Sequence, residues 1–568
     1  MRILLLTHAF NSLTQRLSAE LTACGHEISI EFDIADTVAE EAVALFKPEL
    51  IVAPYMRRAI PQSIWSQRCC LVVHPGIVGD AGPSALDWAI QRGTAEWGVT
   101  VLQAEAAMDA GPVWASATFA LPAAKKSSVY RNEVTQAAIT AVLQAVERFQ
   151  HGGFTPQRPP QLNWQPPMKQ ADRQIDWQAD STATVLAKIN AADGFPGVAD
   201  TLFGHTCHLF DAWPEDSLTG VPGEVVGKRE TALLRATRDG AIWIGHVKRT
   251  AGGNTGIKLP TTLAFAEESA AVSPSSTIDG WWKLAGATWQ DISYEEAGEV
   301  GFLHFDFYNG AMSTTQCQRL REALAWAKQR PVRVLVLMGG RDFWSNGIHL
   351  NVIEQASLAG GSAADESWAN INAMNDLALA LIESPNQITV AALAGNAGAG
   401  GCFLARAADQ VWVRDGVMLN PHYKNMGNLY GSEYWTYLLP RRVGAEMAGT
   451  IMRDRQPMTA ARALACGFSD ARLVGEPQAF RIDVARRAAE LAAGDVLPTL
   501  EHKRAVRATD EAAKPLARYR EEELAMMHRN FYGFDPSYHV ARHHFVRKSL
   551  PSWTPRHLAR HRDLGWHG

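Results

Sequence analysis

The sequence predicts a multidomain α/β protein in which two regions of alternating strands and helices flank a small β-barrel. Short apolar runs alternate with amphipathic stretches over the first 120 residues and again from about residue 295, a pattern typical of βαβ units. Short strands separated by glycine-containing turns fill residues 200–250 instead, which favours a barrel. The length of 568 residues allows about three to five domains of roughly 100–200 residues each.

The first α/β region has a regular order of elements. Strands are predicted at residues 3–6, 27–32, 50–55, 71–74 and 98–103, with helices between several of them, for example at 12–23 and 37–46. The near-continuous apolar run Ile3-Leu4-Leu5-Leu6 is typical of a strand whose sheet is covered on both faces. We therefore expect a mostly parallel sheet.

Proline-rich and loosely patterned segments separate the regions. The prolines between residues 155 and 167 mark a linker. The predicted barrel strands are 205–210, 223–226, 232–235 and 241–247, and a loose stretch at 273–280 ends this unit. The second α/β region is predicted to have strands at 300–307, 332–338, 387–393 and 410–413, and to be mostly helical from about 440 to 529.

Composition and charge exclude several classes of protein. Hydrophobic residues make up 47% and charged residues 20%, which rules out collagen, long coiled coils and wholesale disorder. The net charge of −5 argues against a nucleic-acid coat or a polybasic membrane binder. Seven cysteines without regular spacing do not form a disulfide framework, and no apolar run approaches the ~18 residues that span a bilayer. We expect a cytoplasmic protein that binds neither nucleic acid nor membrane.

A histidine and an aspartate are predicted to lie at one edge of the first sheet. His74 ends an apolar strand, and ligands of open α/β sheets bind at the carboxyl ends of strands. The next strand ends shortly before Asp109, which places its carboxylate at the same edge. A His oriented by an Asp is a common acid–base pair and can stabilise an oxyanion. The alternative is a solvated strand-end His and an Asp in a turn.

The residues around this pair resemble the tetrahydrofolate-dependent formyltransferase family. A Gly-rich turn and a helix follow His74, and Gly-Val-Thr at 98–100 and Asp-Ala-Gly at 109–111 come in the family's order. Ile-Asp-Trp at 175–177 resembles the entry to the C-terminal barrel of methionyl-tRNA formyltransferase. The resemblance covers about residues 1–285. It implies a Rossmann-like formyltransferase domain at 1–165, an OB-like β-barrel domain at 166–285, catalytic roles for His74 and Asp109, and N10-formyltetrahydrofolate as the formyl donor.

One position departs from the family. Its catalytic Asn lies two residues before the His, where this sequence has Val72. An amide that helps to hold the formyl oxygen contributes about 3 kcal/mol to catalysis, so its loss lowers activity unless another group replaces it or the acceptor chemistry differs. Asn11 and Gln15, at the start of the first predicted helix, are the candidate replacements and the predicted cofactor-binding residues.

Two glycine-containing segments follow strands in the second α/β region. The first includes Gly347 and Ile348, and the second, which opens a helix, includes Gly400. Glycine lets the backbone approach a ligand closely, and a helix N-terminus offers unpaired N–H donors. On neighbouring strands, the two segments can aim two N–H groups at one oxygen. Gly-rich turns also serve tight packing, so this alternative stays open.

Together the two segments resemble the crotonase (enoyl-CoA hydratase/isomerase) family. The resemblance implies a crotonase-like α/β domain at residues 286–568, with a helical, basic C-terminal region. By this match the N–H groups of Ile348 and Gly400 form an oxyanion hole for the thioester carbonyl of a coenzyme A ester, and Gly347 belongs to the binding segment. The acidic residue of the family's first motif is His349 here.

The carboxylates of a hydratase are missing from this sequence. The first catalytic Glu of the family aligns with Phe403 and the second falls near Tyr423, so hydration is not expected. Tyr423 and Glu433, in a polar segment flanked by apolar ones, are the candidates for proton transfer, because a desolvated Glu has a raised pKa and can carry a proton at pH 7. The alternative for Glu433 is a carboxylate that stabilises a helix N-terminus.

The C-terminal tail, residues 539–568, is basic. Arg542 and Arg547 are predicted to bind the phosphates of coenzyme A, although a basic tail can also be a solvated surface. The histidines of the tail, including His567, show no repeated ligand spacing, so no metal site is predicted.

The order of the two halves resembles the HypX (HoxX) family of hydrogenase maturation factors over essentially the whole chain. The resemblance implies formyl transfer from N10-formyltetrahydrofolate to coenzyme A, then cleavage of formyl-CoA to carbon monoxide and coenzyme A. The carbon monoxide would serve the iron of [NiFe]-hydrogenase, with maturation proteins or the large-subunit precursor as partners. Two alternatives stay open: a formyltransferase with an amine acceptor and a non-catalytic crotonase module, and a non-catalytic assembly chaperone.

Overall fold

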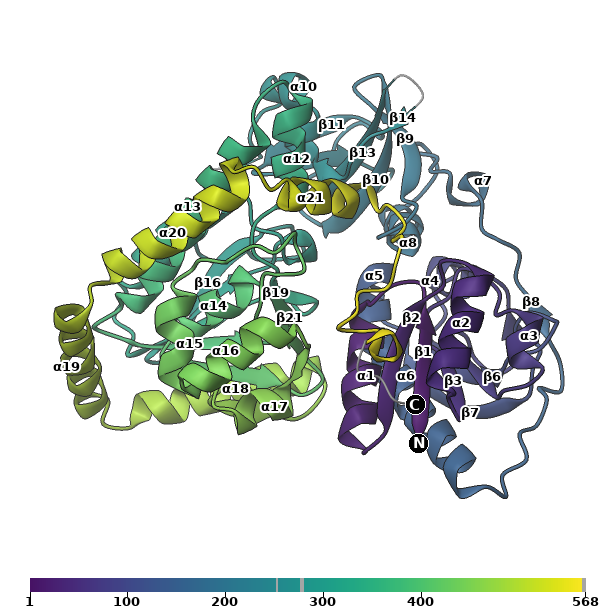
Figure 1. The fold of residues 1–568 in the computed structure, drawn as a ribbon. Coiled ribbons are helices and arrows are strands. Elements are labelled where there is room, and N and C mark those ends of the chain that lie inside the picture. Colours follow the sequence, from purple (N-terminus) through teal and green to yellow (C-terminus); the bar gives the residue numbers. More distant parts are fainter. Residues whose placement is uncertain (252–253, 276–279, 564–568) are drawn as a thin grey trace. The chain divides into compact units, whose positions relative to one another are not determined.

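A computed structural model describes residues 1–251, 254–275 and 280–563 (Figure 1). The chain forms two compact units. The first contains Met1–Ser275 together with the segment from Leu550 onward, and the second contains Ser276–Ser549. Each unit is described separately below. Of the histidines noted in the tail, His567 lies outside the described residues.

The first unit begins with a six-stranded sheet in the order β2-β1-β3-β4-β6-β7. Its strands are β1 (Arg2–Thr7), β2 (Glu27–Phe32), β3 (Leu50–Ala53), β4 (Cys70–His74), β6 (Glu96–Gln103) and β7 (Val113–Ala120). The first four strands are parallel, whereas β6 is antiparallel to both β4 and β7. The five predicted strands are confirmed, and β7 is an edge strand that the sequence did not predict.

Both faces of this sheet are buried, as the apolar run of β1 predicts. Ile3 and Leu5 belong to one core cluster and Leu4 to another, because successive side chains of a strand point to opposite faces. The first cluster includes side chains of α1 (Ser12–Ala23), α4 (Ala85–Gln91) and α6 (Thr135–His151), and the second includes those of α2 (Asp36–Phe46) and α3 (Gln62–Trp65).

The proline-rich linker runs past the loop that follows His74. Its strand β8 (Asn163–Trp164) pairs with β5 (Asp80–Ala81) in that loop. Short helical segments lie on either side of the linker: α5 (Lys126–Val129), the π-helix η1 (Tyr130–Val134) and α7 (Gln170–Arg173). The linker therefore supports the backbone at Asp80.

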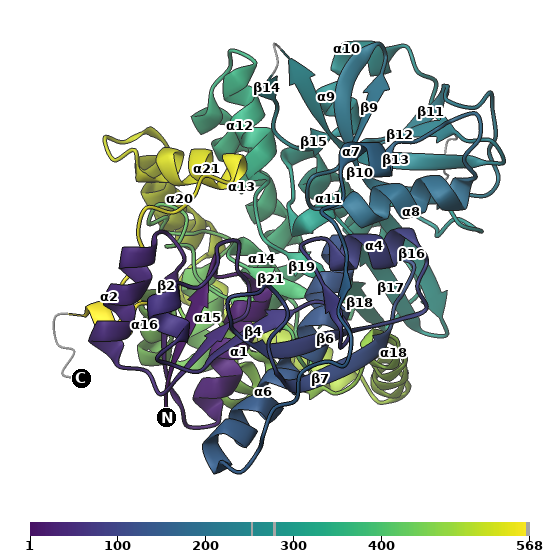
Figure 2. The same cartoon turned by 90° about the vertical axis from the view of Figure 1, so that its right-hand side faces the viewer.

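The small second domain of this unit is an antiparallel sheet in the order β11-β12-β13-β10-β9, with β14 and β15 paired to β13 (Figure 2). All of these pairings are antiparallel, but among the described residues no pairing joins β9 to β11, so closure into the predicted small β-barrel stays a prediction. The helix α8 (Thr182–Ala192) packs on it through Val185 and Ile189. The remaining elements are β9 (Val198–Leu202), β10 (His205–Glu215), β11 (Val225–Arg229), β12 (Ala232–Ala236), β13 (Ala241–Ala251), β14 (Asn254–Thr255), β15 (Leu259–Pro260), α9 (Thr261–Ala264) and α10 (Ala266–Ala270).

The second unit contains two sheets that share a repeated strand arrangement. The larger sheet has the order β16-β17-β18-β20-β22-β25 and the smaller β19-β21-β23-β24. Each of three long strands is followed along the chain by a short strand of the other sheet. The strands are β16 (Ile292–Ala297), β17 (Val300–Phe305), β18 (Val334–Met338), β19 (Phe343–Ser345), β20 (Ile388–Leu393), β21 (Asn396–Gly398), β22 (Gln410–Arg414), β23 (Met418–Asn420), β24 (Met458–Thr459) and β25 (Ala471–Leu473).

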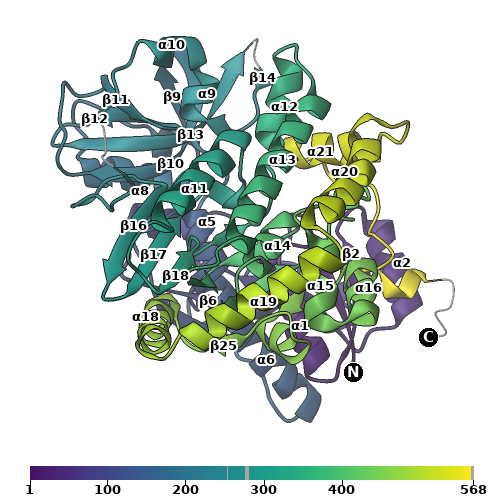
Figure 3. The same ribbon diagram turned by 90° about the vertical axis from the view of Figure 1, so that its left-hand side faces the viewer.

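Helices cover both faces of the larger sheet. Leu335 and Leu337 of β18 pack into one core cluster, and Val334 and Val336 pack into another. α11 and α13 lie side by side over the first cluster, and α18 covers the second (Figure 3). The helices are η2 (Tyr308–Gly310), α11 (Thr314–Ala327), α12 (Leu350–Leu358), α13 (Ala363–Ile382), α14 (Gly400–Arg406), α15 (Trp435–Val443), α16 (Ala445–Asp454), α17 (Ala460–Ala465), α18 (Pro477–Ala493), α19 (Leu497–Ala513), α20 (Leu516–Tyr532) and α21 (Ser537–Arg547).

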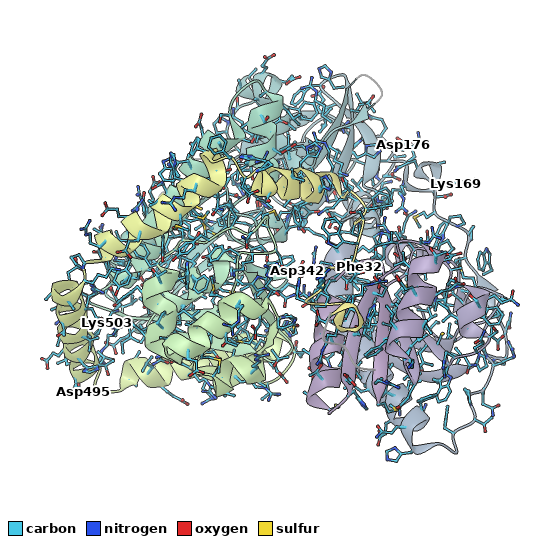
Figure 4. The ribbon with its side chains drawn as sticks, viewed as in Figure 1. Phe32, Lys169, Asp176, Asp342, Asp495 and Lys503 are labelled. Carbon is cyan, nitrogen blue, oxygen red and sulfur yellow. The ribbon has the colours of Figure 1, made fainter. Side chains whose placement is uncertain are left out.

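The chain after Leu550 belongs to the first unit, whereas the sequence assigned it to the domain 286–568. The anchor is Glu31 of β2, whose side chain is fully buried and accepts hydrogen bonds from Thr554, His561 Nε2 (3.0 Å) and Arg562 Nε (2.7 Å). Phe32, labelled in Figure 4, donates its backbone N–H to Thr554 Oγ1 at 2.8 Å. The tail, which includes η3 (Arg560–Arg562), is thus held by a buried ion pair with a carboxylate of the sheet.

Within the described ranges, no helix is long and apolar enough to cross a membrane.

Candidate functional site

His74 lies at the carboxyl end of β4 between two carboxylates. Its Nε2 is 2.8 Å from Asp80 Oδ2, and its Nδ1 is 3.5 Å from Asp109 Oδ2. The imidazole is 5% exposed, and Asp109 Oδ2 also accepts the backbone N–H of Gly82 at 3.0 Å. The structure therefore places Asp109 beside His74, as expected. Both ring nitrogens face carboxylates, so the ring is held in one orientation.

Asp80, the nearer carboxylate, was not predicted to belong to the site. It lies six positions after His74, beyond a tight turn that contains Gly76. A Cβ at Gly76 would lie 2.3 Å from His74 Nε2 and 2.5 Å from Asp80 Oδ2, so only glycine fits between the two side chains. A turn glycine between a strand-end His and a following Asp is the sequence signal that could have identified Asp80.

Asn11 and Gln15 lie beyond the carboxyl end of β1, at the sheet edge where β4 ends in His74. Asn11 is the N-cap of α1 and accepts hydrogen bonds from Thr14 N at 3.0 Å and Thr14 Oγ1 at 3.1 Å. Gln15 donates from Nε2 to the carbonyl of Phe10 at 3.0 Å. The structure thus places both residues at this edge, which the sequence alone could not do, and their cofactor-binding roles stay predictions.

The two glycine segments of the second unit are brought together by the smaller sheet. β19 pairs with β21, and β21 pairs with β23, all in parallel. The loops that follow these strands therefore start at the same edge. A Cβ at Gly347, whose φ is +80°, would lie 3.4 Å from the backbone N of Gly400. Gly400 is the first residue of α14, so its N–H has no acceptor within that helix.

His349 takes a structural position that suits an acidic residue. It is the N-cap of α12, and its Nδ1 accepts the backbone N–H of Val352 at 3.3 Å. An Asp at an N-cap makes the same kind of hydrogen bond, so the imidazole replaces the family's acidic residue as a helix cap. This cap fixes the start of α12 immediately after Ile348.

Tyr423 and Glu433 form a buried hydrogen-bonded pair. The Tyr423 hydroxyl donates to Glu433 Oε2 at 2.5 Å and also lies 2.9 Å from the carbonyl of Ser432. Burial raises the pKa of Glu433 to about 8; the hydrogen bond from Tyr423 opposes this shift, and the charge of Glu523 adds to it. Burial and the neighbouring Glu433 raise the pKa of Tyr423 well above its usual value. At neutral pH this carboxyl can therefore both hold and release a proton.

The Glu433 carboxyl lies directly against Gly400. A Cβ at Gly400 would be 2.5 Å from Glu433 Oε1 and 2.6 Å from its Cδ. The predicted proton-transfer group and one of the two predicted oxyanion-hole residues therefore adjoin. Glu433 directly precedes Tyr434, the N-cap of α15, and the two residues have φ values of +58° and +59°.

An aromatic pair occupies the positions where the sequence lacks hydratase carboxylates. Phe403 stacks on Tyr423 with ring centroids 5.5 Å apart and planes at 11°. Gly431 makes room for this pair, since a Cβ there would lie 2.2 Å from the Tyr423 ring. The Phe403 side chain is fully buried and carries no group that could activate water.

The two tail arginines contact a carboxylate. Arg542 Nε lies 3.0 Å from Glu354 Oε2, and Arg547 also pairs with Glu354. Burial pushes the pKa of Glu354 upward, but hydrogen bonds and charge from Arg547 and Arg542 outweigh it and lower the pKa. Two guanidinium groups facing one carboxylate leave a surplus positive charge. Binding of coenzyme A phosphates by these arginines stays a prediction.

Three family models match successive segments of the chain, in the order of the predicted domains. Residues 31–146 match the model described as formyl transferase, and residues 167–258 match formyl transferase, C-terminal domain. Residues 306–556 match enoyl-CoA hydratase/isomerase. A methionyl-tRNA formyltransferase of Burkholderia thailandensis is 27% identical over 192 residues, which covers 32% of this chain and 57% of that protein.

Two relatives extend over the full chain. The crystal structure of HypX from Aquifex aeolicus in complex with tetrahydrofolic acid is 46% identical, covers 100% of both chains and superposes with a TM-score of 0.96. The hydrogenase maturation factor HoxX of Bradyrhizobium diazoefficiens is 53% identical over 566 residues, covering 99% of this chain and 97% of the relative. The chain therefore belongs to the HypX/HoxX family of hydrogenase maturation factors, with a formyltransferase-like part followed by a crotonase-like part.

Proposed function

We propose that this protein makes carbon monoxide for the active site of [NiFe]-hydrogenase. It transfers the formyl group of N10-formyltetrahydrofolate to coenzyme A and then splits formyl-CoA into carbon monoxide and coenzyme A. The observation that carries the proposal is the buried Tyr423–Glu433 pair, which lies against Gly400 in a crotonase-type site that lacks the hydratase carboxylates.

The first step is assigned to His74 and its two carboxylates. The thiol of coenzyme A attacks the formyl carbon, a C–S bond forms and the C–N bond to N10 breaks. The thiol proton leaves during attack and the departing nitrogen takes one up, and His74, held by Asp80 and Asp109, is the group that carries it. The tetrahydrofolate complex of the Aquifex relative supports a folate donor. Asn11 and Gln15 are the proposed cofactor-binding residues at this edge.

The second step moves one proton from carbon to sulfur. The N–H groups of Ile348 and Gly400 hold the formyl oxygen, and the Glu433 carboxylate removes the formyl hydrogen as a proton. The C–S bond then breaks, which releases carbon monoxide and the thiolate, and the thiolate takes a proton back from the Tyr423–Glu433 pair. No water is consumed and no oxidant or reductant is needed. Gly347, Arg542 and Arg547 are the proposed coenzyme A contacts.

Family membership supports the proposed product and its receiver. A hydrogenase maturation factor that makes carbon monoxide in the cytoplasm must pass it to the iron of the hydrogenase, so maturation proteins or the large-subunit precursor are the proposed partners. A chaperone without catalysis is the second candidate, and the replacement of family catalytic groups by Val72 and Phe403 favours it.

The deciding experiment is product detection. The protein is mixed with N10-formyltetrahydrofolate and coenzyme A, carbon monoxide is measured by the absorbance change of reduced haem, and formate is measured in parallel. We expect carbon monoxide only when both substrates are present. Formyl-donor consumption that is independent of coenzyme A would support an amine acceptor. Binding of folate without consumption would support the chaperone.

A further inference from the structure

The backbone that carries Glu433 is held in a rarely populated conformation. Glu433 and Tyr434 are consecutive non-glycine residues in the left-handed region, with φ values of +58° and +59°, and each side chain is 1% exposed. L-residues avoid this region, so the surrounding contacts must hold it. Such conformations gather at functional sites. Two polar side chains from distant helices supply these contacts.

The first is Asn375 of α13, which is fully buried. Its Oδ1 accepts the backbone N–H of Glu433 at 2.7 Å and the hydroxyl of Ser432 at 2.8 Å. Because a backbone N–H can only donate, the amide oxygen must face Glu433, and this fixes the orientation of the Asn375 side chain.

The second is Glu523 of α20, which is also fully buried. Its Oε2 accepts the backbone N–H of Tyr434 at 2.9 Å. Its Oε1 accepts the backbone N–H of Thr436 at 2.9 Å and the Thr436 hydroxyl at 2.6 Å. Glu523 thus caps the first turn of α15. Asn375 and Glu523 together take the N–H groups of the two strained residues.

We propose that Asn375 and Glu523 are positioning residues for the cleavage of formyl-CoA: they hold residues 432–434 in the conformation that places the Glu433 carboxyl against Gly400. This inference rests on the proposed function, because it assigns the purpose of the strain to the proton transfer made by Glu433. Neither residue needs to touch the substrate.

The charge of Glu523 also acts on Glu433. The titratable groups that interact with Glu433 are Tyr423, from the loop after β23, and Glu523 and Cys317, from α20 and α11. Of these, the Glu523 carboxylate raises the pKa of Glu433, and burial raises the pKa of Glu523 itself to about 7. Changes at Glu523 should therefore alter the pH dependence of the reaction as well as its rate.

The test uses full-length protein and synthetic formyl-CoA, with carbon monoxide measured from pH 5.5 to 9. Asn375→Ala removes the acceptor for the Glu433 N–H and should lower kcat about 10²-fold, the loss expected for a misplacement near 1 Å, with KM unchanged. Glu523→Gln should lower kcat and also move the ascending limb of the pH profile to lower pH, because it removes the negative charge that raises the Glu433 pKa.

Asn375→Asp tests whether loss of the hydrogen bond, and not a loss of folding, lowers the activity of Asn375→Ala. It keeps an oxygen that can accept the Glu433 N–H and adds a negative charge, so it should recover most of the kcat at its own optimum while the ascending limb moves to higher pH. Asn372→Ala and Glu522→Gln are the matched controls on the same helices. Asn372 contacts Arg520, and Glu522 pairs with Lys514 on the surface, so both controls should match the wild type.

The outcomes distinguish this inference from the proposed function. Wild-type protein that makes no carbon monoxide from formyl-CoA overturns both. Wild-type production together with an unchanged kcat in Asn375→Ala overturns the positioning role alone. A kcat that falls at the variant's own pH optimum in Asn375→Ala and Glu523→Gln, and recovers in Asn375→Asp, supports the positioning role. The opposite shifts of the pH profile in Glu523→Gln and Asn375→Asp check that the substituted groups lie close to Glu433, since a charge there acts on the Glu433 pKa. Should Asn375→Ala fail to fold, Asn375→Asp and Glu523→Gln still decide the question.

Discussion

Adding a single methyl group at Gly400 tests whether the Glu433 carboxyl and the oxyanion hole work as one site. The φ of Gly400 is negative, so alanine can adopt its backbone conformation. The added Cβ would lie 2.5 Å from Glu433 Oε1, whereas an ordinary contact begins at about 3.4 Å. The carboxyl must therefore move by about 0.9 Å, and a displacement near 1 Å costs about 10²-fold in rate.

The effect on stability should be much smaller. Overpacking a buried site costs about 1–3 kcal/mol, and replacing glycine by alanine in a helix returns about 0.5–1 kcal/mol. Gly400→Ala should therefore fold and lose about 2.5 kcal/mol of stability at most. The matched control is Gly449→Ala in α16, where a Cβ would meet nothing within 4 Å. That variant should be as stable as the wild type or slightly more so.

The assay is the yield of carbon monoxide and formate from synthetic formyl-CoA, with folate-analogue binding measured by calorimetry as a check on the first half. Glu433→Asp shortens the side chain by one methylene and relieves the clash. The double variant Gly400→Ala/Glu433→Asp should therefore lose less than the product of the two single losses. Wild-type carbon monoxide production by Gly400→Ala would refute the reasoning and leave the glycine with a packing role.

Four further outcomes are expected. His74→Ala should lower formyl transfer by about 10²–10⁴-fold and leave cleavage of supplied formyl-CoA intact, which donor consumption measures. Tyr423→Phe and Glu433→Gln should each reduce carbon monoxide by about 10²-fold or more, with less than additive losses in the double variant, since their side chains share a 2.5 Å hydrogen bond. Carbon monoxide formation by the wild type should rise with pH, with an ascending limb near the Glu433 pKa of about 8. Glu31→Gln should destabilise the first unit by about 3–5 kcal/mol and expose the tail to proteases. Burial raises the pKa of Glu31, but its hydrogen bonds outweigh burial and lower the pKa in the folded protein. The contribution of Glu31 to stability is therefore present above its unfolded pKa and is lost as pH falls through its folded pKa.

The main elements of the fold could be predicted where local sequence and burial agree. The apolar run Ile3–Leu6 and the N-cap Asn11 define β1 and α1, and the structure has both. The edge strands β7 and β16 were missed because part of each is solvated, so their apolar signal is weak. The middle of β7 is Ala-Ser-Ala-Thr at 115–118, and β16 ends in Glu295-Glu296-Ala297.

The repeated strand pairs of the second unit give no fixed sequence period. Each long strand is followed closely by a short one, but the segment between β19 and β20 contains α12 and α13 whereas that between β21 and β22 contains only α14. Unequal helices between equivalent strands hide the repeat from the sequence. The glycines remain visible because Gly347 has a φ of +80°, which side chains disfavour, and because a Cβ at Gly400 would meet the Glu433 carboxyl at 2.5 Å.

The site residues that could not be predicted act through tertiary contacts. Asp80 could have been predicted from the sequence, because it follows His74 in the same loop. Asn375 and Glu523 could not be predicted in this way. Each lies within a helix, and each contacts residues 432–434 only because α13 and α20 pack against that segment. A buried polar side chain within a helix gives no local signal of its partner, whereas a motif near a strand end does.

Water exclusion is the property of a crotonase scaffold that would suit the proposed cleavage of formyl-CoA. A hydratase must deliver water to its thioester, and carboxylates at the positions of Phe403 and Tyr423 would activate that water. Here the two rings stack at 5.5 Å, and Glu433 beside them is 1% exposed. Hydrolysis to formate competes with release of carbon monoxide, and the competition depends on whether water reaches the carbonyl. The burial of Glu433 also raises its pKa, so in the proposed reaction one physical cause would both suppress the side reaction and prepare the proton carrier.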